Sequence, residues 1–228
     1  MARETEIKLR IDNVPAFIRA LTRMGARALG HGSGRVFEEN VIFDTPQGGL
    51  AKHGQLLRIR TETSDGGSRK GKANLKRRVL LTFKRPVARA AQAEPDSRTM
   101  GSHKVREEIE VEVGNAVILT KIFEGLGMSG WFRYEKYRTT FQLPAKKSWA
   151  RGLLIELDET PIGTFVELEG PGLAIDRAAE ELGFSKRDYV LKNYLVLYLE
   201  ECRLKGHEPR QMVFQEAKRR SKPSSVKK

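Results

Sequence analysis

The chain has 228 residues, of which 39% are hydrophobic and 31% are charged, and its formal net charge is +13. This length suits one large domain or two small ones, with a real hydrophobic core. No apolar run reaches the ~20 residues that a membrane helix needs, no apolar signal segment follows Met1, and Cys202 is the single cysteine. We therefore expect a cytoplasmic protein with no membrane association, no disulfide and no thiolate metal site.

The excess positive charge is confined to two segments. Residues 69–78 carry six basic and no acidic side chains, and residues 203–228 carry nine basic and two acidic ones. Together they account for the whole net charge, so the rest of the chain is formally neutral. The predicted organisation is a domain at 1–203 with flexible loops at 64–78 and 87–102, followed by a basic, disordered tail at 204–228. We favour a solvated tail over an arm that binds nucleic acid or polyphosphate.

Alternating charged and apolar residues predict a first strand over residues 3–11. Asn13 and Gly25 then delimit a short helix, with Pro15 in its first turn. Further strands are predicted at 35–44, 55–62, 79–86, 103–113, 131–142, 151–158 and 163–169, and further helices at 115–126, 172–183 and 189–203. About eight consecutive, mostly antiparallel strands with helices at the connections indicate an α+β fold.

The polar faces of these strands carry charges of both signs. For any single strand, a solvent-exposed face is the simpler explanation. Across five or more strands, however, the helices have to cover the apolar faces, which turns the charged faces toward one another. The sequence therefore predicts an eight-stranded antiparallel closed β-barrel, with helices outside it and a charged interior that forms a tunnel for one small ligand.

Charged residues at every second position of a strand suggest what that ligand is. Carboxylates at i and i+2 lie about 6.5–7 Å apart on one face, close enough to bind the same hard cation or neighbouring ones. Arginine and lysine at the same spacing suit adjacent phosphate groups. Acids for Mg²⁺ together with bases for phosphate oxygens are the parts that phosphoryl transfer uses.

The charged motifs follow a definite order along the chain. The first is an ExExK motif, Glu4-Thr5-Glu6-Ile7-Lys8. The later ones are Arg58 and Arg60, Lys84, Glu108 and Glu110, Lys136 and Arg138, Asp158, Glu167 and Glu169, and Lys192. In these motifs and their order, about residues 2–203 resemble the CYTH superfamily, the triphosphate tunnel metalloenzymes. That group includes thiamine triphosphatases, inorganic triphosphatases and class IV adenylyl cyclases.

The resemblance implies a role for each of these residues. It implies that carboxylates hold Mg²⁺ or Mn²⁺, namely Glu4, Glu6, Glu108, Glu110, Asp158, Glu167 and Glu169. It implies that basic side chains bind the triphosphate, namely Lys8, Arg58, Arg60, Lys84, Arg106, Lys136, Arg138 and Lys192. Glu6 and Lys8 are the expected catalytic residues, with Glu6 orienting the attacking water.

Hydrolysis of an inorganic or organic triphosphate is the expected activity. One alternative is a class IV adenylyl cyclase that makes cyclic AMP and pyrophosphate from ATP, and a second is a non-catalytic module that binds polyphosphate or nucleotides. The expected partner is tripolyphosphate, thiamine triphosphate or ATP. The sequence leaves open whether the chain forms a homodimer. Trp131 and Trp149 show no pairing that would stack an organic ring, which favours simple triphosphates.

The remaining polar and aromatic residues are predicted to be structural. Tyr194 follows helical spacing with Tyr198, which favours packing over ligand binding. Glu38 lies in a predicted strand without a motif of its own. The four histidines are scattered and are predicted to lie at the surface or in loops.

Overall fold

A computed structural model describes residues 2–30, 33–69, 72–87 and 103–215. Nearly all of the predicted loop at 87–102 and the end of the predicted tail, 216–228, lie outside the described residues. Across the described ranges, none of the helices is both long and apolar enough to span a membrane.

The order of elements follows the predicted order, with short additions. The strands are β1 (Ala2–Arg10), β2 (Arg27–Ala28), β3 (Arg35–Asp44), β4 (Leu56–Arg69), β5 (Lys72–Pro86), β6 (Lys104–Glu112), β7 (Ser129–Gln142), β8 (Leu154–Thr160) and β9 (Gly163–Glu169). The helices are α1 (Val14–Met24), α2 (Gly49–Lys52), α3 (Ala116–Gly125), α4 (Gly172–Glu181) and α5 (Tyr194–Lys205). The two-residue strand β2 and the single turn α2 are too short to leave a periodic signal in the sequence.

The sheet closes on itself. Its strands are hydrogen-bonded in the order β7-β3-β4-β5-β6-β1-β9-β8, and β8 returns to β7. Every ladder between these strands is antiparallel. Within the described residues this makes an eight-stranded barrel, with β2 paired outside it to the end of β7. The predicted α+β barrel is confirmed.

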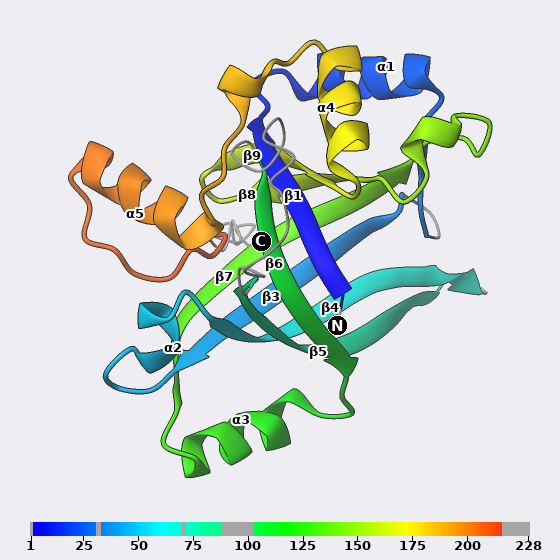
Figure 1. Ribbon diagram of the computed structural model, residues 1–228. Coiled ribbons are helices and arrows are strands. Elements are labelled where there is room, and N and C mark those ends of the chain that lie inside the picture. The colour runs from blue at the N-terminus through cyan, green and yellow to red at the C-terminus, as the bar shows by residue number, and fades with distance from the viewer. Residues whose placement is uncertain (1, 31–32, 70–71, 88–102, 216–228) are drawn as a thin grey trace, which may run out of the picture.

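Apolar residues of one parity face outward and lie beneath helices. Ile7 and Leu9 of β1 form one buried cluster with Phe17 and Leu21 of α1 and with residues of α4. Figure 1 shows α1 and α4 together at one end of the barrel and α3 at the other. Helix α1 begins where the Asn13 side chain accepts a hydrogen bond from the Ala16 amide. Residues of the opposite parity therefore point into the barrel.

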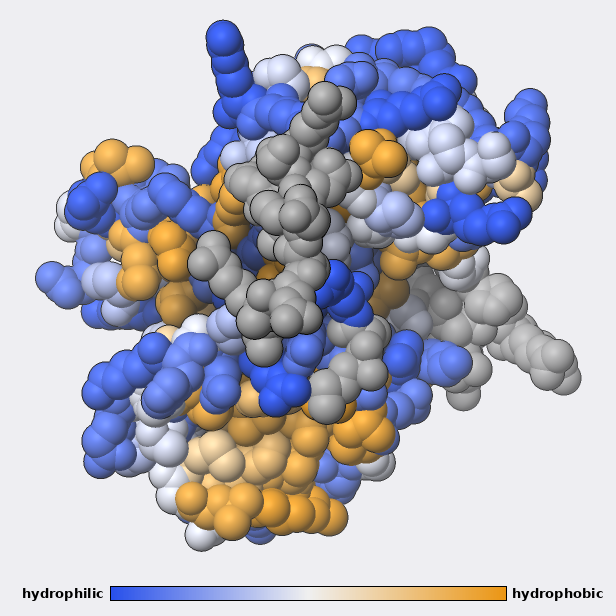
Figure 2. Space-filling view, viewed as in Figure 1, coloured by the Kyte–Doolittle hydropathy of each residue, from blue (hydrophilic) through white to orange (hydrophobic). Residues whose placement is uncertain are grey.

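Helix α3 covers a second outer cluster. Its Phe123 packs against Phe43, Ile59 and Val79, which come from β3, β4 and β5. The opposite side of the helix is apolar as well. Figure 2 shows orange apolar surface gathered at the lower end of the molecule, where Figure 1 places α3.

Where a flexible loop was predicted at 64–78, strands β4 and β5 continue as a hairpin. Their pairing extends from Ser64 opposite Lys76 to Arg69 opposite Lys72, with a register shift between Asp65 and Ser68. Gly66 and Gly67 fill that shift, and glycine is typical of bulges in strands. The glycines thus interrupt the ladder without ending it, which the composition alone did not reveal.

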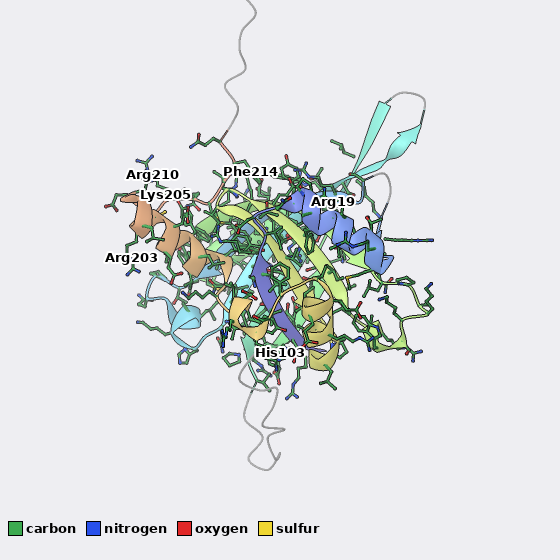
Figure 3. All side chains as sticks on the ribbon, turned by 90° about the horizontal axis from the view of Figure 1, so that it is seen from above. Arg19, His103, Arg203, Lys205, Arg210 and Phe214 are labelled. Carbon is green, nitrogen blue, oxygen red and sulfur yellow. The ribbon has the colours of Figure 1, made fainter. Side chains whose placement is uncertain are left out.

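The chain after α5 also departs from the prediction of a tail that begins at residue 204. It returns from the tip of α5 to the barrel, and Figure 3 shows Phe214 away from Arg203 and Lys205. Met212 is 1% exposed, and its amide donates to the Arg133 carbonyl at 3.0 Å. The Phe214 ring packs on Tyr137, with the two ring centroids 5.3 Å apart. Residues up to 215 are therefore part of the folded domain.

Candidate functional site

A cavity of about 350 Å³ lies inside the barrel. This volume falls within the range of small-molecule sites. Of the residues predicted from the sequence, those that line it are Glu4, Glu6, Lys8, Arg58, Arg60, Lys84, Arg106, Glu108, Glu110, Lys136, Arg138, Glu167 and Glu169. The parity of the strands accounts for this convergence, because alternate side chains on each strand face the interior. The roles of these residues stay predictions.

The ExExK motif on β1 forms the centre of the cavity. Lys8 lies opposite Glu167 in the ladder with β9, and its Nζ is 3.1 Å from Glu167 Oε1 and 3.3 Å from Glu6 Oε1. Burial by itself lowers the pKa of Lys8, but the two carboxylates outweigh it and raise that pKa. Burial likewise raises the pKa of Glu6, yet Lys8 and the contacting Lys104 bring it down to about 2. Glu6 and Lys8 are therefore both charged at neutral pH.

One wall of the cavity pairs Lys84 of β5 with carboxylates from two other strands. Its Nζ donates to both oxygens of Glu4, at 2.6 and 2.7 Å, and lies 3.3 Å from Glu108 Oε1. Lys84 and Glu108 are direct partners in the ladder between β5 and β6. Burial raises the pKa of Glu4 above its usual value, and the neighbouring Glu6 adds to this against the opposing effect of Lys84.

On the opposite wall, Asp158 organises the basic residues of β7. Arg138 donates to both Asp158 oxygens at 2.7 Å, and Lys136 donates to Asp158 Oδ2 at 2.8 Å. The Tyr194 hydroxyl, from the first turn of α5, donates to the same oxygen at 2.7 Å. Asp158 is fully buried and does not line the cavity. Its predicted assistance to a metal stays a prediction, and in this structure both of its oxygens position Arg138, Lys136 and Tyr194.

Glu38 belongs to this wall although it stands in none of the charged sequence motifs. It is 1% exposed, and its Oε2 lies 3.3 Å from Arg60 Nε and 3.4 Å from Lys136 Nζ. Burial raises the pKa of Glu38, but Arg60, Lys136 and Arg138 outweigh it and lower that pKa to about 2. The Asn40 Oδ1 accepts a further hydrogen bond from Arg60 at 3.0 Å. Glu38 and Asn40 thus hold the Arg60 guanidinium at the cavity.

Arg58 is fixed by hydroxyl groups. It donates to Tyr134 Oη and to Thr82 Oγ1, both at 3.1 Å, and Thr82 in turn donates to Glu110 Oε2 at 2.8 Å. Arg58 Nη2 and Glu110 Oε2 are 3.9 Å apart, which is a loose ion pair. Among the cavity bases described so far, Arg58 therefore has the weakest carboxylate partner, and an incoming anion has the least to displace there.

Carboxylates crowd together where β8 and β9 meet. Glu156, which the sequence analysis did not single out, lies opposite Glu167 in the ladder and lines the cavity. Burial raises the pKa of Glu156 to about 7, with Glu167 and Asp158 adding to the effect and Arg138 opposing it. Burial and the neighbouring Glu156 and Glu4 raise the pKa of Glu169 to about 8. This side of the cavity holds more negative charge than its bases compensate.

The crowded carboxylates provide the oxygen donors that Mg²⁺ and Mn²⁺ prefer. Glu156 Oε2 is buried without a hydrogen bond, although it contacts the Arg138 guanidinium. In the part of the chain that the structure describes, no three His, Cys, Asp or Glu side chains are arranged to hold an ion. Lysine and arginine side chains bridge the carboxylates instead. The donor set fits a divalent cation, and Glu4, Glu6 and Glu167 each contact a lysine in this structure.

Lys192 and His103 lie in other surroundings than predicted, and Tyr194 makes a contact that was not predicted. Lys192 lies outside the cavity and donates to Glu200 at 2.7 Å, with 54% of its side chain exposed. It precedes α5 instead of lying on it, because the helix begins only after the cap Asn193. His103 was expected at the surface, but it is buried, with Nε2 2.8 Å from Asp176 Oδ1. Tyr194 packs as predicted and also reaches the cavity.

One border of the cavity is apolar. Trp131 lines it with Ile42, Leu56 and Leu195, and the Trp131 residue is 43% exposed. Trp149, by contrast, packs at the outside of the barrel, where the guanidinium carbon of Arg177 lies 4.5 Å from its ring centroid. The cavity thus combines a charged interior with one aromatic, partly exposed border.

Solved structures share this fold at low sequence identity. A protein from Pyrococcus horikoshii OT3 superposes with a TM-score of 0.63 at 21% identity, over 87% of this chain and 99% of that one. A Vibrio parahaemolyticus protein described as a candidate adenylate cyclase superposes with a TM-score of 0.61 at 16% identity, over 85% of this chain and 96% of that one. A Hippeastrum protein, described as an adenylyl cyclase candidate with a dominant triphosphatase activity, gives 0.53 at 19% identity, over 87% and 96%. At these identities the likeness shows the fold alone.

No curated protein matches the chain. The family model described as CYTH domain matches residues 2–194, which is most of the sequence. This span contains the whole barrel and every charged residue of the cavity named above. The chain therefore belongs to the CYTH domain family.

Proposed function

We propose that the protein hydrolyses a triphosphate in its barrel cavity with the help of a divalent cation. The observation that carries this proposal is the charge composition of the cavity. In the described residues its lining contains eight basic side chains, Lys8, Arg58, Arg60, Lys84, Lys104, Arg106, Lys136 and Arg138, and eight acidic ones, Glu4, Glu6, Asp44, Glu108, Glu110, Glu156, Glu167 and Glu169.

A cavity so balanced suits a ligand that brings both signs of charge. A bare triphosphate would have to displace carboxylates from the bases and leave them unpaired, and a bare cation would do the reverse. A complex of triphosphate with a cation replaces both sets of partners at once. Each buried charge then keeps a counter-charge, which matters because an unpaired buried charge is strongly destabilising.

Glu4, Glu6, Glu167 and Glu169 are the residues that would hold the cation, with Glu156 beside them. A divalent cation bound there would neutralise phosphate charge and polarise phosphoryl oxygens. Lys8, Arg58 and Arg138 would bind the phosphate groups and hold the terminal phosphorus in place. Glu6 would accept a hydrogen bond from the attacking water and orient it, and its low pKa keeps it ionised for that task.

A second candidate is the conversion of ATP to cyclic AMP and pyrophosphate. The aromatic border with Trp131 favours an organic group on the substrate, because exposed aromatic rings stack on flat bases. The same border also suits hydrolysis of an organic triphosphate. The reaction products distinguish these two chemistries.

The test is to incubate the full chain with tripolyphosphate, thiamine triphosphate or ATP, each with Mg²⁺ or Mn²⁺, and to assay phosphate, pyrophosphate and cyclic AMP. We expect phosphate release that stops when a chelator is added and that falls sharply in Glu167→Gln. Cyclic AMP with pyrophosphate would replace the hydrolase with a cyclase. Binding without any turnover would show that the protein is a non-catalytic module that binds polyphosphate or nucleotides.

A matched variant tests the aromatic border in the same assay. Trp131→Ala removes the ring and no charge. If the border binds an organic group, this variant raises KM for ATP or thiamine triphosphate and leaves KM for tripolyphosphate unchanged. An equal change for all three substrates would show that the ring serves only to pack the strand.

A further inference from the structure

An apolar surface that the proposed function does not use lies on α3 and the neighbouring end of β6. The exposed apolar residues there are Ile109, Val111, Val117, Ile118, Ile122 and Leu126, between 44% and 68% exposed. We call this set the α3 patch. Figure 2 shows it as one apolar area at the lower end of the molecule. A patch on the order of 500 Å² is at the upper end of what a monomer leaves exposed.

Helix α3 is apolar on both of its sides. Phe123 and Leu119 face the barrel and complete the cluster beneath the helix. Val117, Ile118 and Ile122 face away from it and remain exposed. A helix that is apolar all round is normally buried on all sides, so the outer side of α3 calls for a partner.

The rest of this chain offers little that could cover the patch. Residues 88–102 contain one large apolar side chain, Met100, and residues 216–228 contain one, Val226. Both stretches are otherwise small, polar or charged. Neither stretch carries an apolar segment that matches the patch, which favours a cover from another molecule.

The charges on the outer side of α3 indicate that the partner is a second copy of this chain. Lys121 and Glu124 are both exposed there, and neither forms an ion pair with any described residue. Two copies of α3 packed antiparallel about a two-fold axis near Ile122 would place Lys121 of each copy opposite Glu124 of the other. An isologous interface requires this kind of self-complementary surface. A Cβ at Gly125 would meet nothing within 4 Å, so this end of the helix is open to close approach.

We propose that the chain forms a homodimer through the α3 patch, with α3 packed against α3 of the second copy. The apolar area supplies most of the roughly 800 Å² that each partner buries in a standard interface. The patch lies at the end of the barrel opposite α1 and α4, so the interface leaves those helices free (Figure 1).

Sedimentation velocity of the purified full chain over a dilution series tests this proposal. We expect a mass of twice 25.8 kDa that falls to the monomer on dilution. The double variant Ile118→Glu, Ile122→Glu should be a monomer at concentrations where the native chain is dimeric. Its circular dichroism should be unchanged, because both side chains are exposed. The matched control Leu173→Glu, at a 77% exposed leucine on α4, should stay dimeric.

Charge exchange tests the two-fold arrangement itself. Lys121→Glu or Glu124→Lys alone places like charges face to face and should raise the dissociation constant several-fold. The combination of both should restore it. A native chain that sediments as a monomer at every concentration overturns the proposal, including the case in which the patch binds a different protein. A dimer that survives the Ile118→Glu, Ile122→Glu variant, or is lost in Leu173→Glu, overturns it as well.

Discussion

Single residues in the cavity are held in place by one another. Glu167 contacts both Lys8 and Arg138, and Asp158 binds Lys136 and Arg138 from behind. Such buried pairs contribute little net stability, but removing one partner costs about 3–5 kcal/mol because it leaves the other charge unpaired. Variants of cavity residues therefore have to be measured for stability as well as for activity.

The two carboxylates Glu169 and Glu6 should respond to pH in opposite ways. The pKa of Glu169 is raised to about 8, so its contribution to stability is present below its usual pKa of 4.5 and is lost as pH rises through about 8. Without metal, Glu169→Gln should therefore be more stable than the native chain at about pH 8.5, and this advantage should vanish near pH 5. Urea unfolding with a chelator at both pH values measures this.

Glu6→Gln is the matched control for that measurement. The pKa of Glu6 is lowered to about 2, so its contribution is present above 4.5 and is lost only as pH falls through about 2. Glu6→Gln should thus be less stable than the native chain at both pH values. The charge-crowding explanation is wrong if Glu169→Gln is destabilised at about pH 8.5 to the same degree as Glu6→Gln.

The sequence predicted cavity residues well wherever a strand alternates cleanly. Strand β1 alternates charged and apolar residues, and its inward face was identified from that pattern alone. The inward face of β3 reads Val36, Glu38, Asn40 and Ile42, a mixture with no parity signal, so Glu38 was missed. Glu156 shares the parity of Asp158 on β8 and could have been found from it.

Residues outside the strands were harder to predict. Tyr194 reaches the cavity because α5 begins beside it, and helical spacing does not reveal which turn of a helix meets another element. Lys192 was placed on the same helix, whose start was predicted five residues too early. The start of a helix depends on its cap residue, and the cap of α5 is Asn193.

At the level of elements, the segment after α5 completes the barrel. Strand β8 pairs with β7 only from Tyr137 onward, which leaves the edge of β7 at Arg133 to Glu135 open on that side. Residues 211–214 fill this edge, with the Glu135 amide donating to the Met212 carbonyl at 2.9 Å. The stretch 206–228 as a whole is polar and basic, and this composition concealed the short apolar run Met212 to Phe214 that packs on the barrel.

Two truncations should separate this segment from the basic end of the chain. Ending the chain after Lys205 removes the buried Met212, whose loss alone should cost about 2–5 kcal/mol by analogy with core methionine deletions. Ending it after Gln215 keeps every contact described here. We therefore expect a clear drop in Tm for the shorter chain and none for the longer one. Equal Tm values for the two truncated chains would show that residues 206–215 do not stabilise the barrel.

The whole molecule reverses the usual arrangement of a small domain. Its charged strand faces point inward, and its apolar faces point outward to α1, α3 and α4. A charged interior is stable only when each charge has a partner, which the cross-strand pairs provide. This is why the fold could be predicted from parity alone, whereas the choice between hydrolase and cyclase could not. The two reactions use the same triphosphate-binding groups.

The central claim is that the barrel cavity, and no other basic surface, binds the triphosphate. Isothermal titration calorimetry tests this claim most directly, with tripolyphosphate titrated into the protein in the presence of Mg²⁺. The proteins to compare are the native chain, Arg58→Ala, Arg19→Ala and the chain ended after Gln215. Arg58 faces the cavity, whereas Arg19 is exposed on α1 (Figure 3). We predict one binding site per chain. The affinity for tripolyphosphate should be at least tenfold lower in Arg58→Ala, which corresponds to about 1.4 kcal/mol of binding free energy. The affinity should be unchanged in Arg19→Ala and in the chain ended after Gln215. Native affinity in Arg58→Ala, or loss of binding in the chain ended after Gln215, would contradict the account.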